Sequence, residues 1–195
     1  MPDNTSATGG YLRQTTGPLD GIDFRRFIGT VLVGITGLDA QLVRPIWQQN
    51  PPPIPNIDTD WLAFGQTNRR GDADAYQFES DDGLTTTQLR HEECDFLLTF
   101  YGPNCLDVAG RLRDAFDITQ NQEQLQLAGM AMVDLTEIIH APELINDRFF
   151  DRADMTMTIR REIRRDYRIL SFVAANGAIV ANRANDSTLT LEWAT

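Results

Sequence analysis

Two segments of the chain carry apolar residues at the spacing of an amphipathic helix. Before the first of them, Asp20 suits the N-cap position. The apolar positions that follow are Phe24, Phe27, Ile28, Val31, Ile35 and Leu38. Gly34 and Gly37 are expected to end this helix, and Leu32 and Val33 make its second half apolar almost all round. Such a helix is expected to be buried on both sides, under a sheet or against another subunit. The second helix is marked by Cys105, Val108, Ala109, Leu112 and Phe116.

Two further segments alternate with the period of a β-strand for about twice the usual strand length, residues 84–101 and 155–172. In the first, only the second half has an apolar face, made by Cys94, Phe96, Leu98 and Phe100. In the second, Met155, Met157, Ile159, Arg161, Ile163 and Arg165 share one face, and Thr156, Thr158, Arg160, Glu162, Arg164, Asp166 and Arg168 share the other. If the two strands pair antiparallel, Arg160 and Arg164 would face Glu92, Glu93 or Asp95.

Shorter patterns complete the predicted elements. Short strands are expected over residues 43–47, 61–67, 75–79 and 129–133, with a terminal hairpin from 178–181 and 189–193. Asn50–Pro55 is rich in proline and predicts a stiff spacer or crossing loop. Residues 121–126 are interpreted as a polar, Gln-rich link and residues 135–150 as a long ordered loop.

This order of elements predicts an α+β fold, an antiparallel β-sheet flanked by two α-helices. Long projecting strands, a proline-rich loop and an extended N-terminal arm are expected to accompany it. We expect three regions: an arm over residues 1–18, the α+β domain over 19–175 and a hairpin extension over 176–195. Tyr11 and Leu12 are the few large groups of the arm and would anchor it to a neighbour.

Charge narrows the classes of function. The 195 residues contain 17 Lys+Arg and 28 Asp+Glu, for a net charge of −11, and every one of the basic residues is arginine. A generic nucleic-acid binder needs a basic surface, so this balance argues against one. Lysine-dependent chemistry is excluded outright. No stretch is apolar enough to span a bilayer, and we expect a soluble protein made in the cytoplasm, with no membrane partner.

Several groups of residues are candidate sites of chemistry. His91, Glu93 and Asp95 share one side of a strand and would bind a metal or act as acid and base. A cross-strand ion-pair ladder with arginines is the interpretation we favour. Its members would be Arg160, Arg161, Arg164, Arg165, Arg168, Glu92, Glu93 and Asp95.

The acidic segment with Asp72, Asp74, Glu79, Asp81 and Asp82 lacks the order of an EF-hand and is interpreted as a solvated turn. Cys94 and Cys105 are expected to be buried thiols, and we predict no catalytic residue and no cofactor.

A set of short motifs, in one order from about Tyr11 to Ala175, resembles the neck or tail terminator proteins of tailed bacteriophages and prophages. The motifs are Tyr11-Leu12, Pro18-Leu19-Asp20-Gly21, Val33-Gly34-Ile35-Thr36-Gly37-Leu38, Leu42-Val43-Arg44-Pro45-Ile46-Trp47, the proline run, Asp60-Trp61-Leu62-Ala63-Phe64-Gly65, Arg90-His91-Glu92, Phe100-Tyr101-Gly102-Pro103 and Ile159-Arg160-Arg161-Glu162-Ile163-Arg164-Arg165. The resemblance implies a structural virion protein with no catalytic motif. It implies a hexameric ring at the neck, assembled in the host cytoplasm, that caps the tail tube and joins it to the head connector.

The partners implied by the resemblance are the tail tube protein, the head-tail connector or adaptor and collar proteins, and the sheath protein if the tail is contractile. Genomic DNA would pass through the lumen without sequence-specific binding. Because a lumen that lets DNA slide should repel phosphate, we expect Asp72, Asp74, Asp81 and Asp82, or Glu92 to Asp95, to line the lumen or an axial face. The alternatives are a head-completion or adaptor ring, a metal-dependent enzyme that uses His91, Glu93 and Asp95, and a DNA-binding module.

Overall fold

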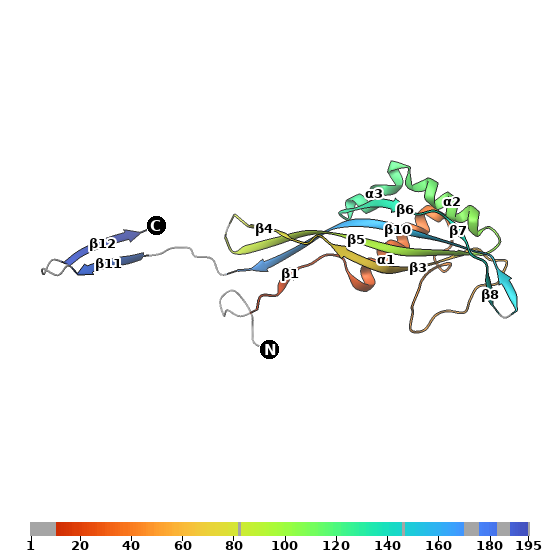
Figure 1. Cartoon of the computed structure of the whole chain (residues 1–195), viewed down its shortest axis with the longest axis horizontal. Helices are drawn as coiled ribbons and strands as arrows, with labels where there is room; N and C mark the ends of the chain where they lie inside the picture. Colours follow the sequence, from red (N-terminus) through yellow and green to blue (C-terminus); the bar gives the residue numbers. More distant parts are fainter. Residues whose placement is uncertain (1–10, 82, 146, 170–175, 183–187, 195) are drawn as a thin grey trace. The chain divides into compact units, whose positions relative to one another are not determined.

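The computed structural model describes residues 11–81, 83–145, 147–169, 176–182 and 188–194. The chain divides into two compact units. The larger unit comprises Gly17–Tyr76 and Leu89–Arg164, and the smaller unit combines Met1–Thr16, Gln77–Gln88 and Arg165–Thr195. The helices that Figure 1 labels belong to the larger unit. The residues of the hydrophobic core belong to it as well. The boundaries expected after residues 18 and 175 stay a prediction.

Helix α1 (Gly21–Thr36) confirms the first helix of the sequence pattern. It begins where Asp20 accepts a hydrogen bond from the Gly21 amide at 3.0 Å, which satisfies a donor that has no partner within the helix. It ends at Gly37, whose φ of 68° favours glycine and whose amide bonds back to the last turn. Gly34 lies inside the helix, so the expectation that it helps to end the helix is wrong.

The sheet of the larger unit is built on two long strands, β5 (Thr85–Tyr101) and β10 (Arg152–Arg168). On one side of β5, β3 (Trp61–Gly71) pairs with it antiparallel, and β2 (Val43–Pro45) adds a parallel edge strand. On the other side of the sheet, β6 (Met130–Leu135) and β7 (Ile139–His140) pair antiparallel with β10. β5 and β10 also run antiparallel, because Asp95 meets Thr158 while Glu92 meets Arg161. The predicted α+β class with a mostly antiparallel sheet is confirmed.

Three helices pack on this sheet where the sequence predicts two. Helix α2 (Cys105–Phe116) is the expected second helix. Helix α3 (Thr119–Leu127) occupies the segment interpreted as a polar link, so that interpretation is wrong. Glutamine is a good helix former, but only Leu125 of α3 is buried. The segment therefore has no apolar stripe from which a helix would be predicted.

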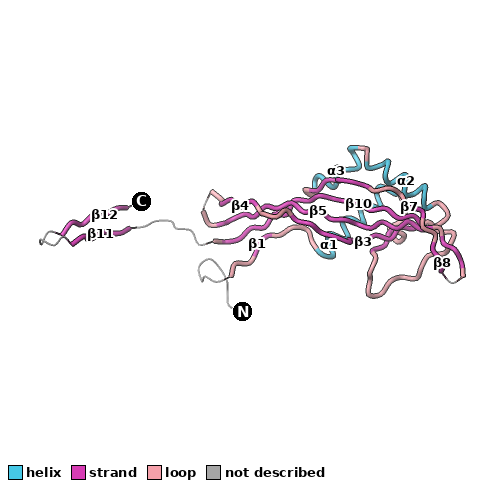
Figure 2. The backbone as a smooth tube through the Cα atoms, viewed as in Figure 1, coloured by secondary structure: helices cyan, strands magenta, loops and turns pink. Residues whose placement is uncertain are grey.

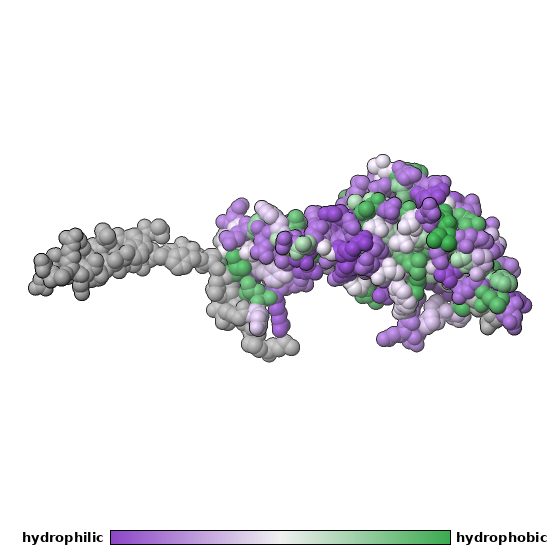
Figure 3. Space-filling model, viewed as in Figure 1, coloured by the Kyte–Doolittle hydropathy of each residue, from purple (hydrophilic) through white to green (hydrophobic). Residues whose placement is uncertain are grey.

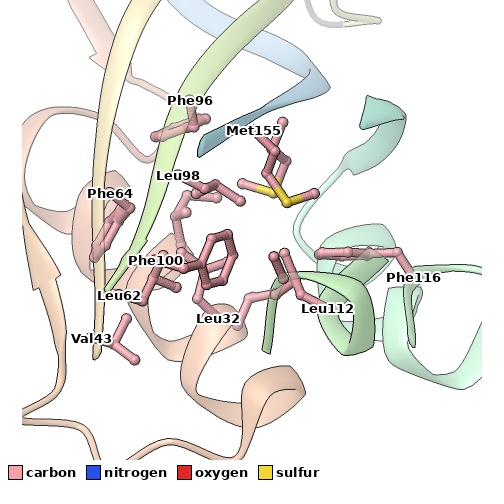
Figure 4. Packing of buried hydrophobic residues seen from close by; sticks show 14 of the residues in the cluster. Leu32, Val43, Leu62, Phe64, Phe96, Leu98, Phe100, Leu112, Phe116 and Met155 are labelled. Atoms are coloured by element: carbon pink, nitrogen blue, oxygen red, sulfur yellow. The ribbon is translucent and has the colours of Figure 1, made fainter. Parts of the chain in front are cut away.

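The hydrophobic core lies between the helices and the sheet. In Figure 4, Leu32 of α1 and Leu112 of α2 point toward residues of β3 and β5, among them Leu62 and Phe100. The faces of the long strands are as predicted, since Cys94, Phe96, Leu98 and Phe100 of β5 and Met155, Met157 and Ile159 of β10 are buried. Burying one such side chain contributes roughly 2 kcal/mol.

The segment 135–150 is not one long loop. Besides the end of β6 and the two residues of β7, it contains a hairpin of β8 (Glu143–Ile145) and β9 (Arg148–Phe150). Strands of two or three residues are too short to display a period of two in the sequence, which is why the interpretation failed.

The smaller unit consists of strands. β1 (Gln14–Thr16) pairs antiparallel with the end of β10, and β4 (Tyr76–Glu79) pairs with β5. β11 (Asn176–Asn182) and β12 (Thr188–Ala194) pair antiparallel with each other and confirm the terminal hairpin. The predicted turn of this hairpin falls mainly in residues 183–187, outside the described residues.

A bulge in β3 changes the faces to which its side chains point. Gln66 lies opposite Phe96, whereas Asn68 lies opposite Asp95, so Thr67 is an extra residue in the pairing. Beyond it, Arg69 lies opposite Cys94, a buried residue of the face toward the helices. The sequence predicts a strand that stops at Thr67 because the alternation breaks there. The structure continues the strand to Gly71.

A tight glycine turn joins β5 to α2. Gly102 has a φ of 111°, and its amide donates to the Asp151 carbonyl at 3.1 Å. Asp60 lies against the turn, where it accepts hydrogen bonds from the Asn104 amide at 2.9 Å and from its side chain at 3.0 Å. A Cβ on Gly102 would lie 2.5 Å from an Asp60 carboxylate oxygen and 2.7 Å from the Thr59 carbonyl oxygen. Only glycine fits this position.

Residues 46–60 connect β2 to β3 without helix or strand (Figure 2). Arg44 ties the proline run to β2, because its guanidinium donates to the Pro53 carbonyl at 2.7 Å and to the Gln41 carbonyl at 2.8 Å. That this run acts as a stiff spacer stays a prediction.

Candidate functional site

The candidate site is the charged part of the sheet in the larger unit, where β3, β5 and β10 run side by side. Alternation sends Glu92 and Arg161 toward the helices and sends Glu93, Asp95 and Arg160 to the opposite face. In Figure 3, hydrophilic side chains gather on the visible face over β5 and the end of β3. The charges therefore form two groups, one on each side of the sheet.

The first group, which we name the Arg161 cluster, consists of Arg161, Glu92, Asp20 and Arg69. The Arg161 side chain is only 1% exposed, and it donates to Glu92 at 3.0 Å, to Asp20 at 3.4 Å and to the Leu19 carbonyl at 2.7 Å. Its guanidinium carbon lies 4.2 Å from the centre of the Phe24 ring. Arg69 completes the cluster with a 2.7 Å contact to Asp20. Through these bonds β10 holds the chain where it enters α1.

Electrostatics explain the ionisation of Asp20. The hydrogen bond from Arg69 is the main reason why the pKa of the Asp20 carboxyl lies well below its ordinary value of 3.8. Burial raises this pKa, but the Gly21 amide and the charges of Arg69 and Arg161 lower it further. Asp20 is therefore a carboxylate at every pH at which the protein is commonly handled.

We expect Asp20→Asn to destabilise the protein by about 1 kcal/mol at pH 7. The reason is that Arg69 and Arg161 lose a negatively charged partner, which lies at the exposed side of the cluster. Asparagine caps helices as well as aspartate does, so the helix start is kept. The folded-state pKa of Asp20 is lowered, so its contribution is complete above the unfolded-state pKa and is lost as the pH falls toward the folded-state pKa. Urea unfolding should show a constant difference between wild type and variant from pH 7 to about pH 4 and a shrinking one below. A difference that persists unchanged to pH 3 would contradict this origin.

The second group lies on the face away from the helices. Arg70 meets Glu93 and Asp95, both at 3.4 Å, and Arg160 meets Glu93 at 3.6 Å. Thr158 donates to Asp95 at 2.9 Å. Each of these carboxylates is shared between donors from different strands, so the group links the strands across the sheet.

The structure also places the remaining candidate residues. Asp72 meets Arg160 at 3.5 Å and His91 at 3.7 Å. Asp74, Asp81, Arg164 and Arg168 are exposed and Arg165 is partly exposed, whereas Asp82 lies outside the described residues. The structure thus brings Arg160 and Arg161 to acidic partners on opposite faces. Their roles between subunits stay a prediction.

A metal site at His91, Glu93 and Asp95 has little support among the residues that the structure describes. No three His, Cys, Asp or Glu side chains in this part of the chain are arranged to hold a metal ion. Glu93 and Asp95 are engaged by Arg70 instead. Cys94 and Cys105 are both buried and unpaired, as predicted, and burial raises the pKa of each thiol.

Sequence reasoning missed two members of the Arg161 cluster. The sequence pattern identifies Asp20 only as a helix cap, and it places Arg69 between two predicted strands. A signal for the cluster was present in Arg161 itself, which stands between Ile159 and Ile163 on the apolar face of its strand. A buried arginine on such a face needs acidic partners from elsewhere in the chain.

Similarity to known proteins identifies the family of this chain. No curated protein matches the chain. A family model described as phage neck terminator protein matches residues 23–183, which is most of the chain. The match includes α2, α3, both long strands and all of α1 except its first two residues. None of the helices in the described ranges combines the length and apolarity needed to cross a membrane. The chain belongs to the phage neck terminator family and is therefore a structural protein of the phage neck, part of the virion.

Proposed function

We propose that this chain forms a closed ring, six-membered, that ends the tail tube and joins it to the head-neck connector. The observation that carries the proposal is the family match over residues 23–183. The partners we propose are the tail tube protein, the connector or adaptor and collar proteins, and the sheath protein where the tail is contractile. A ring of this kind needs one surface of each subunit to fit a different surface of the next.

We further propose that genomic DNA passes through the ring without sequence-specific binding. The net charge of −11 per subunit supports this, because repeated negative charge around a lumen repels phosphate. Asp72, Asp74, Asp81 and Asp82 are the acidic residues that we assign to the lumen or an axial face. Glu92 and Asp95 are mostly buried and engaged by arginines, so we assign these two to the stability of the subunit.

The test is the mass of the purified protein by light scattering across a concentration series, alone and with tail tubes, followed by negative-stain electron microscopy. Six-fold rings, alone or at the ends of tubes, support the proposal. Twelve-fold rings would indicate a head-completion or adaptor ring instead. Protein that forms no ring under either condition would refute it.

We expect Arg164→Glu to reduce ring formation at least tenfold, since like charges brought together at a contact cost several kcal/mol. Arg164 is exposed in β10 and belongs to the proposed ladder between subunits. Arg111→Glu on α2 is the matched control, because Arg111 is an exposed arginine outside the ladder. The fraction of protein in rings, measured by light scattering, should fall only for Arg164→Glu. An Arg164→Glu chain that assembles like wild type would count against this placement.

A further inference from the structure

A groove of about 860 Å³ opens beside α1 in the larger unit. Ile22 and Val33 of α1 line it on one side, and Val43, Trp47 and Phe64 line it on the other. Ile22 is 60% exposed. Phe24, Ile28 and Leu32 of the same helix are buried in the core, so the chain covers the other side of α1 and leaves Ile22 open to the groove.

Trp47 is the most unusual residue of the groove. Its backbone has a φ of 58°, which is rare for a bulky side chain and costs about 1–3 kcal/mol. The side chain is nevertheless 67% exposed. Its ring lies over Gly65, where an added Cβ would come within 2.8 Å of it. A strained backbone and a glycine therefore hold an exposed tryptophan in one position, and fixed tryptophans are typical centres of protein interfaces.

The charged residues that line the groove indicate what kind of partner binds in it. Arg25 and Arg26 line the groove, and no carboxylate does. Asp23 meets Arg26 at 3.2 Å from outside the lining. The chain as a whole carries a net charge of −11. A basic, apolar groove favours an acidic partner, and a second copy of a chain with this net charge is such a partner.

We propose that the groove beside Trp47 docks a second copy of this chain, and that the contact is head-to-tail, with the groove of one copy on a different surface of the next. The inference rests on the proposed ring and names the surface by which one subunit binds its neighbour. A fixed aromatic anchor supplies affinity, and the arginines select an acidic partner surface.

The test places a photo-cross-linking amino acid at Ile22, with the same amino acid at Leu127 as control. Leu127 is an exposed apolar residue of α3, outside the groove. The protein is illuminated alone and with tail tubes, and the cross-linked peptides are identified by mass spectrometry. We expect Ile22 to give dimers through peptides of this chain, at least tenfold more than Leu127. Trp47→Ala, which should fold normally because the side chain is exposed, should weaken self-association at least tenfold.

The outcomes separate this inference from the proposed ring. If rings form and the Ile22 variant gives no cross-link to a second copy of this chain, the groove is not the contact between subunits. The proposed ring is not contradicted by that result. A cross-link from Ile22 to the tail tube protein would overturn the inference in favour of another partner. Rings that persist unchanged in Trp47→Ala would also overturn it. If no ring forms alone or with tubes, both proposals fail.

Discussion

Replacing Arg161 by methionine should lower the free energy of unfolding by about 3 kcal/mol, because removing one partner of a buried ion pair leaves the other charge uncompensated. The Arg161 side chain is 1% exposed and holds Glu92 at 3.0 Å. Methionine matches the apolar part of the side chain and can pack on Phe24. The loss is therefore electrostatic, and it falls mainly on Glu92. Glu92 keeps only a 3.7 Å contact with Arg69, whereas Asp20 keeps its 2.7 Å contact with the same arginine.

Urea unfolding at pH 7 measures this loss, and the neighbouring residue is its control. Arg160 is 44% exposed and points to the opposite face. We expect Arg160→Met to cost less than about 1 kcal/mol. Adding Glu92→Leu to Arg161→Met should restore much of the stability, because apolar pairs often replace buried ion pairs at little cost. Equal losses for Arg160→Met and Arg161→Met, or no recovery in the double variant, would refute the role given to the Arg161 cluster.

Gly102→Ala should destabilise the protein by roughly 4 kcal/mol, a loss seen only where a substitution breaks a specific structural requirement. Two requirements are broken together. The φ of 111° is unfavourable for any residue with a Cβ, and the new methyl group would lie within 2.7 Å of backbone atoms of Thr59 and Asp60. Relief of the clash would move Asp60, which accepts two hydrogen bonds from Asn104, the residue that precedes α2.

The control for Gly102→Ala is the same substitution inside a helix. Gly110 lies in α2 with no atom within 4 Å of an added Cβ. Alanine is there the better helix former by about 1 kcal/mol, so Gly110→Ala should raise the melting temperature while Gly102→Ala lowers it. Thermal unfolding followed by circular dichroism gives both values. A Gly102→Ala chain as stable as wild type would mean that the turn adjusts without loss.

Periodicity predicted those elements whose pattern is long and unbroken. The helix α1 and the strands β5 and β10 each bury one continuous face, and their burial follows the sequence pattern. Periodicity failed where no face is buried, as in α3, which fixes only Leu125 in the core. It failed again in β3, because the extra residue Thr67 interrupts the alternation.

The candidate site was predictable in its residue types and only partly in its contacts. The sequence places Arg160 near Glu92, Glu93 or Asp95 if β5 and β10 pair antiparallel, and in the structure Arg160 contacts Glu93. The pairing of Arg161 with Asp20 joins residues far apart in the sequence, and no local pattern encodes it. The contacts of Trp47 could not be predicted from the sequence either, because no sequence pattern indicates the positive φ at this residue.

The bulge at Thr67 makes the charged site tolerant of the loss of one residue. Because Gln66 lies opposite Phe96 and Asn68 lies opposite Asp95, deletion of Thr67 would leave Asn68 to Gly71 opposite the same residues of β5. Arg69 would stay on the side of Asp20, and Arg70 on the side of Asp95. A strand of the present length that paired Thr67 with Asp95 would instead turn both arginines to the opposite face. Among relatives, a one-residue deletion at this bulge should therefore keep the pairing of these charges, whereas a one-residue deletion elsewhere in β3 should not.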